Sequence, residues 1–126
     1  MSEPIHQEFE ITREQVTRYA DVAVDHNPLH LDDEFARERG FPGAIAHGLL
    51  TLGLISSALE ASFGSAWTSG GRIEARFSAP VPVGARVRVD AAPIDSSEAS
   101  ELHYSLEARV ADAIVVKATV SVPVTS

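Results

Sequence analysis

The chain has 126 residues, 44% of them hydrophobic, and a formal net charge of −8 at pH 7. This length and composition indicate one globular domain, residues 1–126, and the acidic balance argues against a nucleic-acid-binding protein, which needs a basic surface. With no cysteine in the sequence, disulfides, thiolate catalysis and cysteine-ligated metals are excluded. Neither a secretory signal nor an apolar run of membrane-spanning length is visible, so we expect a cytoplasmic protein without membrane contacts.

The N-terminal segment predicts a strand followed by a helix. Ile5, Phe9 and Ile11 alternate with polar residues, as in a strand with one buried face, although Gln7 interrupts the pattern. Residues 12–15, Thr-Arg-Glu-Gln, form a capping box that opens a helix. The apolar stripe of this helix consists of Val16, Tyr19, Ala20 and Ala23, spaced i, i+3, i+4 and i+7.

The helix runs into a turn that contains Asp25 and His30, five positions apart. Pro28 fixes its own φ and keeps Asn27 out of helical geometry, and asparagine side chains commonly bond the backbone of turns. A rigid turn can hold a carboxylate and an imidazole facing one point, and general acid–base chemistry on a water molecule requires these two groups. Taken alone, however, the pair favours an ordinary turn over a catalytic site.

Two further helices are predicted before residue 65. Residues 31–39 carry a short helical pattern with Asp32 as its cap and Gly40 as its end. Residues 31–45 as a whole are expected to line an apolar pocket, although Phe35 and Phe41 are equally compatible with a plain core. Residues 47–63 are apolar on nearly every side, so we expect this helix to be central and buried. Its first turn has free N–H groups, and Gly48 allows a carbonyl oxygen to approach the backbone closely.

The C-terminal half changes to the period of strands after a Gly/Ser-rich loop at residues 65–71. Apolar and polar residues alternate along four stretches, which are residues 72–79, 86–91, 102–110 and 114–122. The last two are joined by a segment short enough for a hairpin turn. Four half-buried strands predict an antiparallel sheet with one apolar face, and the 47–63 helix is the element long and apolar enough to fill it. The expected fold class is α+β, with an antiparallel sheet wrapped around a central helix.

Three segments carry a resemblance to a known family. Residues 19–32 (Tyr-Ala-Asp-Val-Ala-Val-Asp-His-Asn-Pro-Leu-His-Leu-Asp) resemble the hydratase motif of the MaoC-like, (R)-specific enoyl-CoA hydratases, and residues 42–50 and 76–84 resemble that family's second and third blocks. The similarity extends from about Ile11 to Val122. It implies a single hot-dog domain and a hydro-lyase that hydrates trans-2-enoyl-CoA to 3-hydroxyacyl-CoA, or dehydrates a 3-hydroxyacyl thioester, in fatty-acid or related acyl metabolism.

The resemblance also implies a site. Asp25 and His30 would be the catalytic pair, and the N–H of Gly48 would hold the thioester oxygen. The candidate substrate-binding residues are Gly48, His47, Ser56 and Asn27. One departure is that many members have Ser-Gly before the aspartate, where this chain has Ala23-Val24. Val24 is β-branched and does not readily take a positive φ, yet we expect the family geometry to be kept because the Asn27-Pro28 turn holds Asp25 from the other side.

The expected partner is an acyl-CoA or acyl-carrier-protein thioester, with no cofactor and no metal, since the histidines show no recognisable ligand spacing. A homodimer joined through sheet edges is expected, with a heterodimer of two hot-dog subunits as an alternative. Four arginines, at positions 72, 76, 86 and 88, are expected on two neighbouring strands, where one could contact a phosphate.

Two other functions stay open. The chain could be a hetero-oligomer subunit that shapes an acyl tunnel, or a thioesterase using Glu60, which lies more than three turns beyond Gly48.

Overall fold

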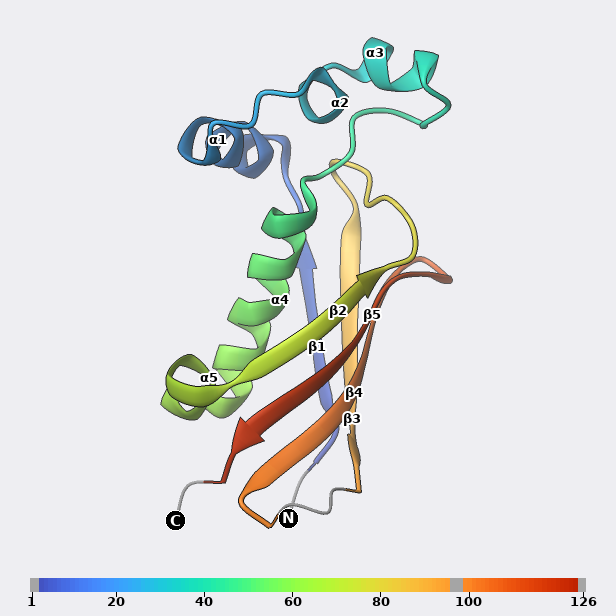
Figure 1. Cartoon of the computed structure of the whole chain (residues 1–126). Helices are drawn as coiled ribbons and strands as arrows, with labels where there is room; N and C mark the ends of the chain where they lie inside the picture. The colour runs from blue at the N-terminus through green and yellow to red at the C-terminus, as the bar shows by residue number, and fades with distance from the viewer. Residues whose placement is uncertain (1–2, 96–98, 125–126) are drawn as a thin grey trace.

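The computed structural model describes residues 3–95 and 99–124. The elements, in chain order, are β1 (Ile5–Glu10), α1 (Arg13–Ala23), α2 (Pro28–Leu31), α3 (Asp33–Glu38), α4 (Gly48–Phe63), α5 (Ser65–Gly70), β2 (Arg72–Phe77), β3 (Arg86–Ile94), β4 (Glu101–Val110) and β5 (Ala113–Pro123) (Figure 1). Within the described part of the chain, no helix is both long enough and apolar enough to cross a bilayer.

The strands form one antiparallel sheet, as the alternating pattern predicted, and their order in it is β1-β3-β4-β5-β2. Strands β3, β4 and β5 are consecutive neighbours, and the β4–β5 hairpin turns at Ala111, which has a φ of 53°. Strand β1 adds to the outside of β3, with Ile5 opposite Ala91. Strand β2 adds to the outside of β5, with Ile73 opposite Val120. Both edges of the sheet are therefore formed by strands that arrive from earlier in the chain.

The four arginines do not form one cluster, because the two strands that carry them are not neighbours. Strands β4 and β5 separate β2 from β3. Arg72 and Arg76 consequently lie on an edge strand, whereas Arg86 and Arg88 lie beside β1, where Arg86 Nε is 3.3 Å from Glu8 Oε1. The expectation of neighbouring strands was wrong because alternation identifies the polar face of a strand but not its pairing partner.

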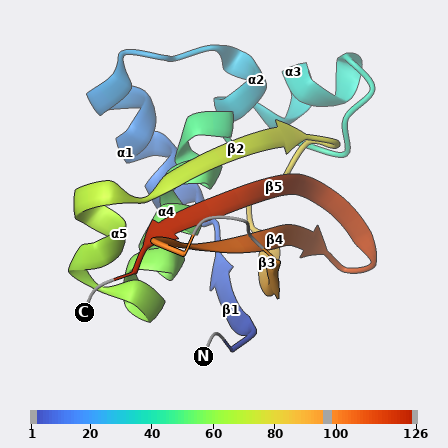
Figure 2. The ribbon, with the colours of Figure 1, turned by 60° about the horizontal axis from the view of Figure 1, so that its bottom comes forward.

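Helix α4 packs along the inner face of the sheet (Figures 1 and 2). Its buried stripe is Thr51, Ile55 and Leu59, at i, i+4 and i+8, and the last two are fully buried against sheet side chains such as Leu106. Burying each such aliphatic side chain contributes about 1.5–3 kcal/mol. The opposite face of α4 is open, and Leu49 there is 69% exposed. The predicted central helix is therefore buried along the side that meets the sheet, and a single sheet leaves its other side open.

Two smaller differences from the sequence prediction concern helices. The pattern predicted for residues 31–39 divides into α2 and α3, with Asp32 between them accepting a hydrogen bond from Phe35 N–H as the predicted cap. The predicted loop at residues 65–71 is instead mostly the short helix α5. That helix buries Trp67, whose ring leaves no room for a side chain at Gly71, because a Cβ there would lie 2.0 Å from Trp67 Cε3. The burial of one tryptophan thus accompanies a helix in a stretch whose glycine and serine content predicts a loop.

Helices α1, α2 and α3 lie together beyond one end of the sheet, at the end where α4 begins (Figure 1). The predicted capping box opens α1, with Thr12 and Gln15 exchanging hydrogen bonds between side chain and backbone. Backbone bonds between Ile11 and the Gly84–Ala85 turn hold the entry to α1 against the start of β3. This arrangement brings the Asp25–His30 turn over the first residues of α4.

Candidate active site

Asp25 is positioned by the way in which α1 ends. Val24 closes the helix with φ 54° and ψ 46°, in the left-handed region, where a β-branched residue is uncommon. The N–H of Asp25 donates to Ala20 O at 2.9 Å, and this bond closes a Schellman motif. The left-handed residue of that motif, here Val24, is usually glycine. The Val24 side chain is 81% exposed, so it packs against little. Val24 therefore takes the conformation that its branched side chain disfavours, and the aspartate follows directly.

The turn after Asp25 is held by hydrogen bonds within the turn. Asn27 Oδ1 accepts a hydrogen bond from Leu29 N–H at 3.0 Å, and Pro28 occupies the first position of α2. The N–H of Asn27 donates to Asp25 Oδ1 at 3.3 Å, which steadies the carboxylate. The Asn27 side chain is thus occupied as a helix cap.

His30 is oriented by a carbonyl group. Its Nδ1 lies 2.7 Å from Ile45 O, and because a carbonyl oxygen can only accept, Nδ1 carries the hydrogen. The same Ile45 donates its N–H to Leu29 O at 3.1 Å. Two hydrogen bonds therefore join α2 to Ile45, and Nε2 is the nitrogen of His30 that remains for chemistry.

His47 joins the two halves of the predicted site. It is 2% exposed, and its Nε2–H donates to the backbone carbonyl of Asp25 at 3.0 Å. Its ring stacks on that of His30, with centroids 3.9 Å apart and planes 28° apart, and packs against Tyr19 at 4.7 Å. One carboxylate oxygen of Asp25 and one ring nitrogen each of His30 and His47 lie within 4.8 Å of one another. The structure thus brings three of the predicted residues together.

Two histidines and one carboxylate are also a common metal-binding set, but the geometry of the rings does not suit one. A metal would lie in the plane of each imidazole, about 2.0–2.1 Å from each nitrogen. Rings stacked with planes 28° apart direct their in-plane lone pairs side by side rather than to one point. The cluster is better arranged to hydrogen-bond a water or a substrate oxygen.

Gly48 and His30 border the same pocket. Gly48 is the first residue of α4, and Thr51 N–H makes the first helical bond, to His47 O, so the N–H groups before Thr51 have no acceptor within the helix. They carry the positive end of the helix dipole. The pocket has a volume of about 460 Å³ and its remaining walls are mainly apolar, formed by Phe41, Ile45, Ala46, Phe77, Ala79, Pro80 and Val81. A carbonyl oxygen bound at Gly48 would therefore place an acyl chain among these side chains.

The phenylalanines of the expected pocket segment have different environments. Phe41 lines the pocket, whereas the ring of Phe35 lies under the guanidinium of Arg39, 3.8 Å from its centroid. The opposite wall comes from the end of β2 and the residues after it, where Phe77 ring atoms lie 3.6 Å from a Cβ placed on Gly48. Sequence reasoning assigned this wall no role.

Ser56 lies two turns along α4 from Gly48. Its Oγ accepts a hydrogen bond from Trp67 Nε1–H at 2.9 Å. This contact links α4 to α5, and Ser56 is not among the residues that line the pocket at Gly48 and His30. A substrate contact by Ser56 stays a prediction.

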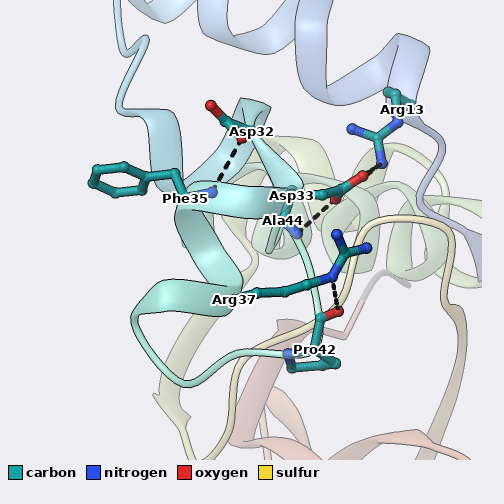
Figure 3. Close-up of polar contacts among 7 residues, drawn as sticks. All are labelled: Arg13, Asp32, Asp33, Phe35, Arg37, Pro42 and Ala44. Carbon is teal, nitrogen blue, oxygen red and sulfur yellow. Dashed lines mark hydrogen bonds and ion pairs between the residues drawn. The ribbon is translucent and has the colours of Figure 1, made fainter.

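The structure adds one residue that sequence reasoning did not single out. Asp33 accepts hydrogen bonds from Arg13 and from Ala44 N–H (Figure 3). The Ala44 N–H, and then the Arg13 guanidinium, lower the pKa of the Asp33 carboxyl below its ordinary value. The one signal in the sequence is that a second aspartate directly follows the cap Asp32. One carboxylate suffices to cap α3, so the second is free for another contact.

Comparisons with known proteins agree with this fold. The family model described as MaoC like domain matches residues 2–115. The chain is 39% identical over 82 residues to the 3-hydroxyacyl-thioester dehydratase Z of Mycobacterium tuberculosis, covering 62% of this chain and 54% of the relative. It is 39% identical over 83 residues to the 3-hydroxybutyryl-CoA dehydratase of Methylorubrum extorquens, covering 64% and 51%. The chain thus spans about half the length of these two curated relatives.

The fold has a solved counterpart along nearly its whole length. The (R)-hydratase from A. caviae superposes with a TM-score of 0.83, covering 98% of this chain and 95% of that chain, at 23% identity. The antiparallel sheet packed on α4 is therefore the expected hot-dog fold. Together with the match over residues 2–115, this means that the chain belongs to the MaoC-like domain family.

Proposed function

We propose that the protein adds water across the double bond of trans-2-enoyl thioesters to give (R)-3-hydroxyacyl thioesters, and catalyses the reverse dehydration. One observation carries the proposal: a carboxylate oxygen of Asp25 and one ring nitrogen each of His30 and His47 lie within 4.8 Å of one another, and His30 and Gly48 border one largely apolar pocket. The names of the two curated relatives, both dehydratases of 3-hydroxyacyl thioesters, support it.

In the proposed mechanism the thioester carbonyl binds at the Gly48 N–H. Enolate character develops on this oxygen during the reaction, so the N–H and the helix dipole stabilise the transition state more than the substrate. Because the N-terminus of α4 already faces the pocket, this stabilisation requires little rearrangement.

Asp25 and His30 hold one water near C3 of the enoyl chain. Asp25 acts as principal base and takes a proton from the water while the water oxygen bonds to C3. His30, protonated on both nitrogens and fixed through Nδ1 by Ile45 O, delivers its Nε2 proton to C2. Transfer of the proton from Asp25 to His30 then restores both groups. Loss of one such positioned acid or base costs about 10²–10⁴-fold in rate.

The thioesterase alternative receives less support. Glu60 is exposed near the far end of α4, more than three turns from Gly48. It therefore cannot reach a carbonyl bound at the start of that helix without a large rearrangement of the chain.

We also propose that the active form is a homodimer. Strand β2 is a sheet edge with one unpaired side, and even its inward-facing Ile73 and Ala75 are half-exposed. Unpaired edges favour addition of a further strand. The exposed Leu49 at the start of α4 would also gain from a covering surface. The alternative of a heterodimer predicts hydratase activity only after a second hot-dog subunit is added.

The proposed function is tested by following the loss of enoyl absorbance on crotonyl-CoA. Asp25→Asn and His30→Ala should each lower turnover by about 10²–10⁴-fold while leaving the circular dichroism spectrum intact. The chain offers a matched control pair in Asp21, an exposed carboxylate in the last turn of α1, and His26, an exposed imidazole in the turn that follows, 2.8 Å apart. Asp21→Asn and His26→Ala should retain activity. Near-normal turnover in either Asp25→Asn or His30→Ala removes that residue from the mechanism.

A further inference from the structure

The carboxylate of Asp33 joins three segments that are distant in the sequence. Its two oxygens lie 3.2 and 3.0 Å from Arg13 Nη2 on α1, and Oδ1 also accepts from Ala44 N–H at 2.9 Å. Figure 3 shows Asp33 on α3 between these two partners. A Cβ on Gly43 would lie 3.2 Å from Asp33 Oδ1, so glycine at that position permits the close approach.

The segment that Asp33 holds is the one that orients His30. Ala44 is followed by Ile45, whose carbonyl accepts the Nδ1–H of His30 at 2.7 Å. On its other side this segment bonds to the residues before β3, where Ala44 O accepts from Val83 N–H at 2.9 Å and Ala46 N–H donates to Val81 O at 2.8 Å. The segment is therefore held between the Val81–Val83 stretch on one side and Asp33 on the other.

We propose that Asp33 is a positioning residue for His30, acting through Ala44 and the carbonyl of Ile45. Its own partners do not include the imidazole, and exposed ion pairs such as Arg13–Asp33, with side chains 55% and 38% exposed, contribute little to global stability. The effect of Asp33 thus falls on the orientation of the His30 ring. The catalytic part of this inference rests on the proposed function, whereas the ring orientation can be measured without turnover.

The neighbouring Asp32 supplies a matched control. Both aspartates lie at the start of α3, and each accepts one backbone N–H, Asp32 from Phe35 at 3.1 Å and Asp33 from Ala44. Asp32→Ala and Asp33→Ala therefore each remove one charge and one backbone hydrogen bond, and Asp33→Ala also removes the contact with Arg13. Only Asp33→Ala releases the segment that carries the Ile45 carbonyl.

The primary measurement is the ¹⁵N–¹H spectrum of the histidine side chains, with the His30 resonances assigned from His30→Ala. In the wild-type protein and in Asp32→Ala, the neutral ring should carry its hydrogen on Nδ1. In Asp33→Ala, the Nδ1–H signal should weaken as the Nε2–H form becomes populated. Asp33→Asn keeps an oxygen for Ala44 N–H and should restore the wild-type signal. An unchanged His30 signal in Asp33→Ala, or an equal change in Asp32→Ala, overturns the proposal.

Kinetics with crotonyl-CoA give the second measurement. Because small displacements of a catalytic group reduce rate strongly, Asp33→Ala should lower kcat about tenfold with KM changed by no more than about twofold, and Asp32→Ala should leave both near wild type. If Asp33→Ala does not fold, Asp33→Glu, whose longer side chain cannot hold both partners in place, should weaken the same Nδ1–H signal, and an unchanged signal there overturns the proposal. If the wild-type protein hydrates no enoyl thioester, the proposed function fails, and the His30 signal alone still decides the positioning role.

Discussion

Replacing Val24 with glycine should make the protein more stable, although the substitution removes a whole side chain. Val24 sits at φ 54° and ψ 46°, and a non-glycine residue in the left-handed region costs about 1–2 kcal/mol. Its side chain is 81% exposed, so little apolar burial is lost on truncation. Glycine makes the unfolded chain more flexible, which offsets about 0.4–1 kcal/mol of the gain. The expected net effect lies between about 0 and 1.6 kcal/mol of added stability, centred near about 0.8 kcal/mol.

Val22 provides the matched control, because it is 84% exposed but lies inside α1. In a right-handed helix glycine is less favourable than valine, so Val22→Gly should lower the free energy of unfolding by about 0.3–0.5 kcal/mol. Urea midpoints at equal protein concentration measure both variants, provided that the slope of the transition is unchanged. If Val24→Gly lowers the midpoint as Val22→Gly does, the left-handed closure of α1 is not strained and the reasoning fails.

Three further outcomes follow from the structure. Ala44 N–H and Arg13 lower the pKa of Asp33 below its ordinary value of 3.8, so its stabilisation, which is small for an exposed group, is present above pH 3.8 and is lost as the pH falls through the lowered value. The urea midpoint should therefore fall slightly less with acid in Asp33→Asn than in the wild type. Gly71→Ala should strongly lower Tm because its Cβ would lie 2.0 Å from the Trp67 ring, whereas Gly53→Ala, which meets nothing within 4 Å, should add up to about 1 kcal/mol. Ile55→Ala, at a fully buried position, should cost about 2–5 kcal/mol in urea unfolding.

Much of the fold could be predicted because local patterns carry it. The alternation along residues 72–122 identified the strands, and the capping box at Thr12 identified the start of α1. Strand order could not be read in this way, since alternation says which face of a strand is buried and not which strand lies beside it. The one-sided burial of α4 was hidden for a related reason, because a helix that is apolar all round gives no signal of which side meets the sheet.

The same difference between local pattern and tertiary contact decides which site residues could be predicted. Asp25, His30 and Gly48 were predicted from motifs that lie close together in the sequence. The role of Asp33 was not, because two adjacent aspartates look alike until the tertiary structure brings Ala44 to one of them. Ser56 was assigned by resemblance, but the contact of its hydroxyl comes from Trp67, in a stretch predicted to be a loop.

The strand order has a consequence for how the protein folds. Strands β3, β4 and β5 pair with their neighbours in sequence, whereas β1 must find β3 across most of the chain, with Ile5 opposite Ala91. Closing that long loop is entropically costly, so the three-stranded meander should form first and β1 should dock late. Since α1 follows β1 directly, the Asp25 turn settles onto His47 only after that step. During synthesis, β1 and the helices up to α4 emerge before the sheet exists, and they remain the part of the chain most exposed to aggregation until β3 is made.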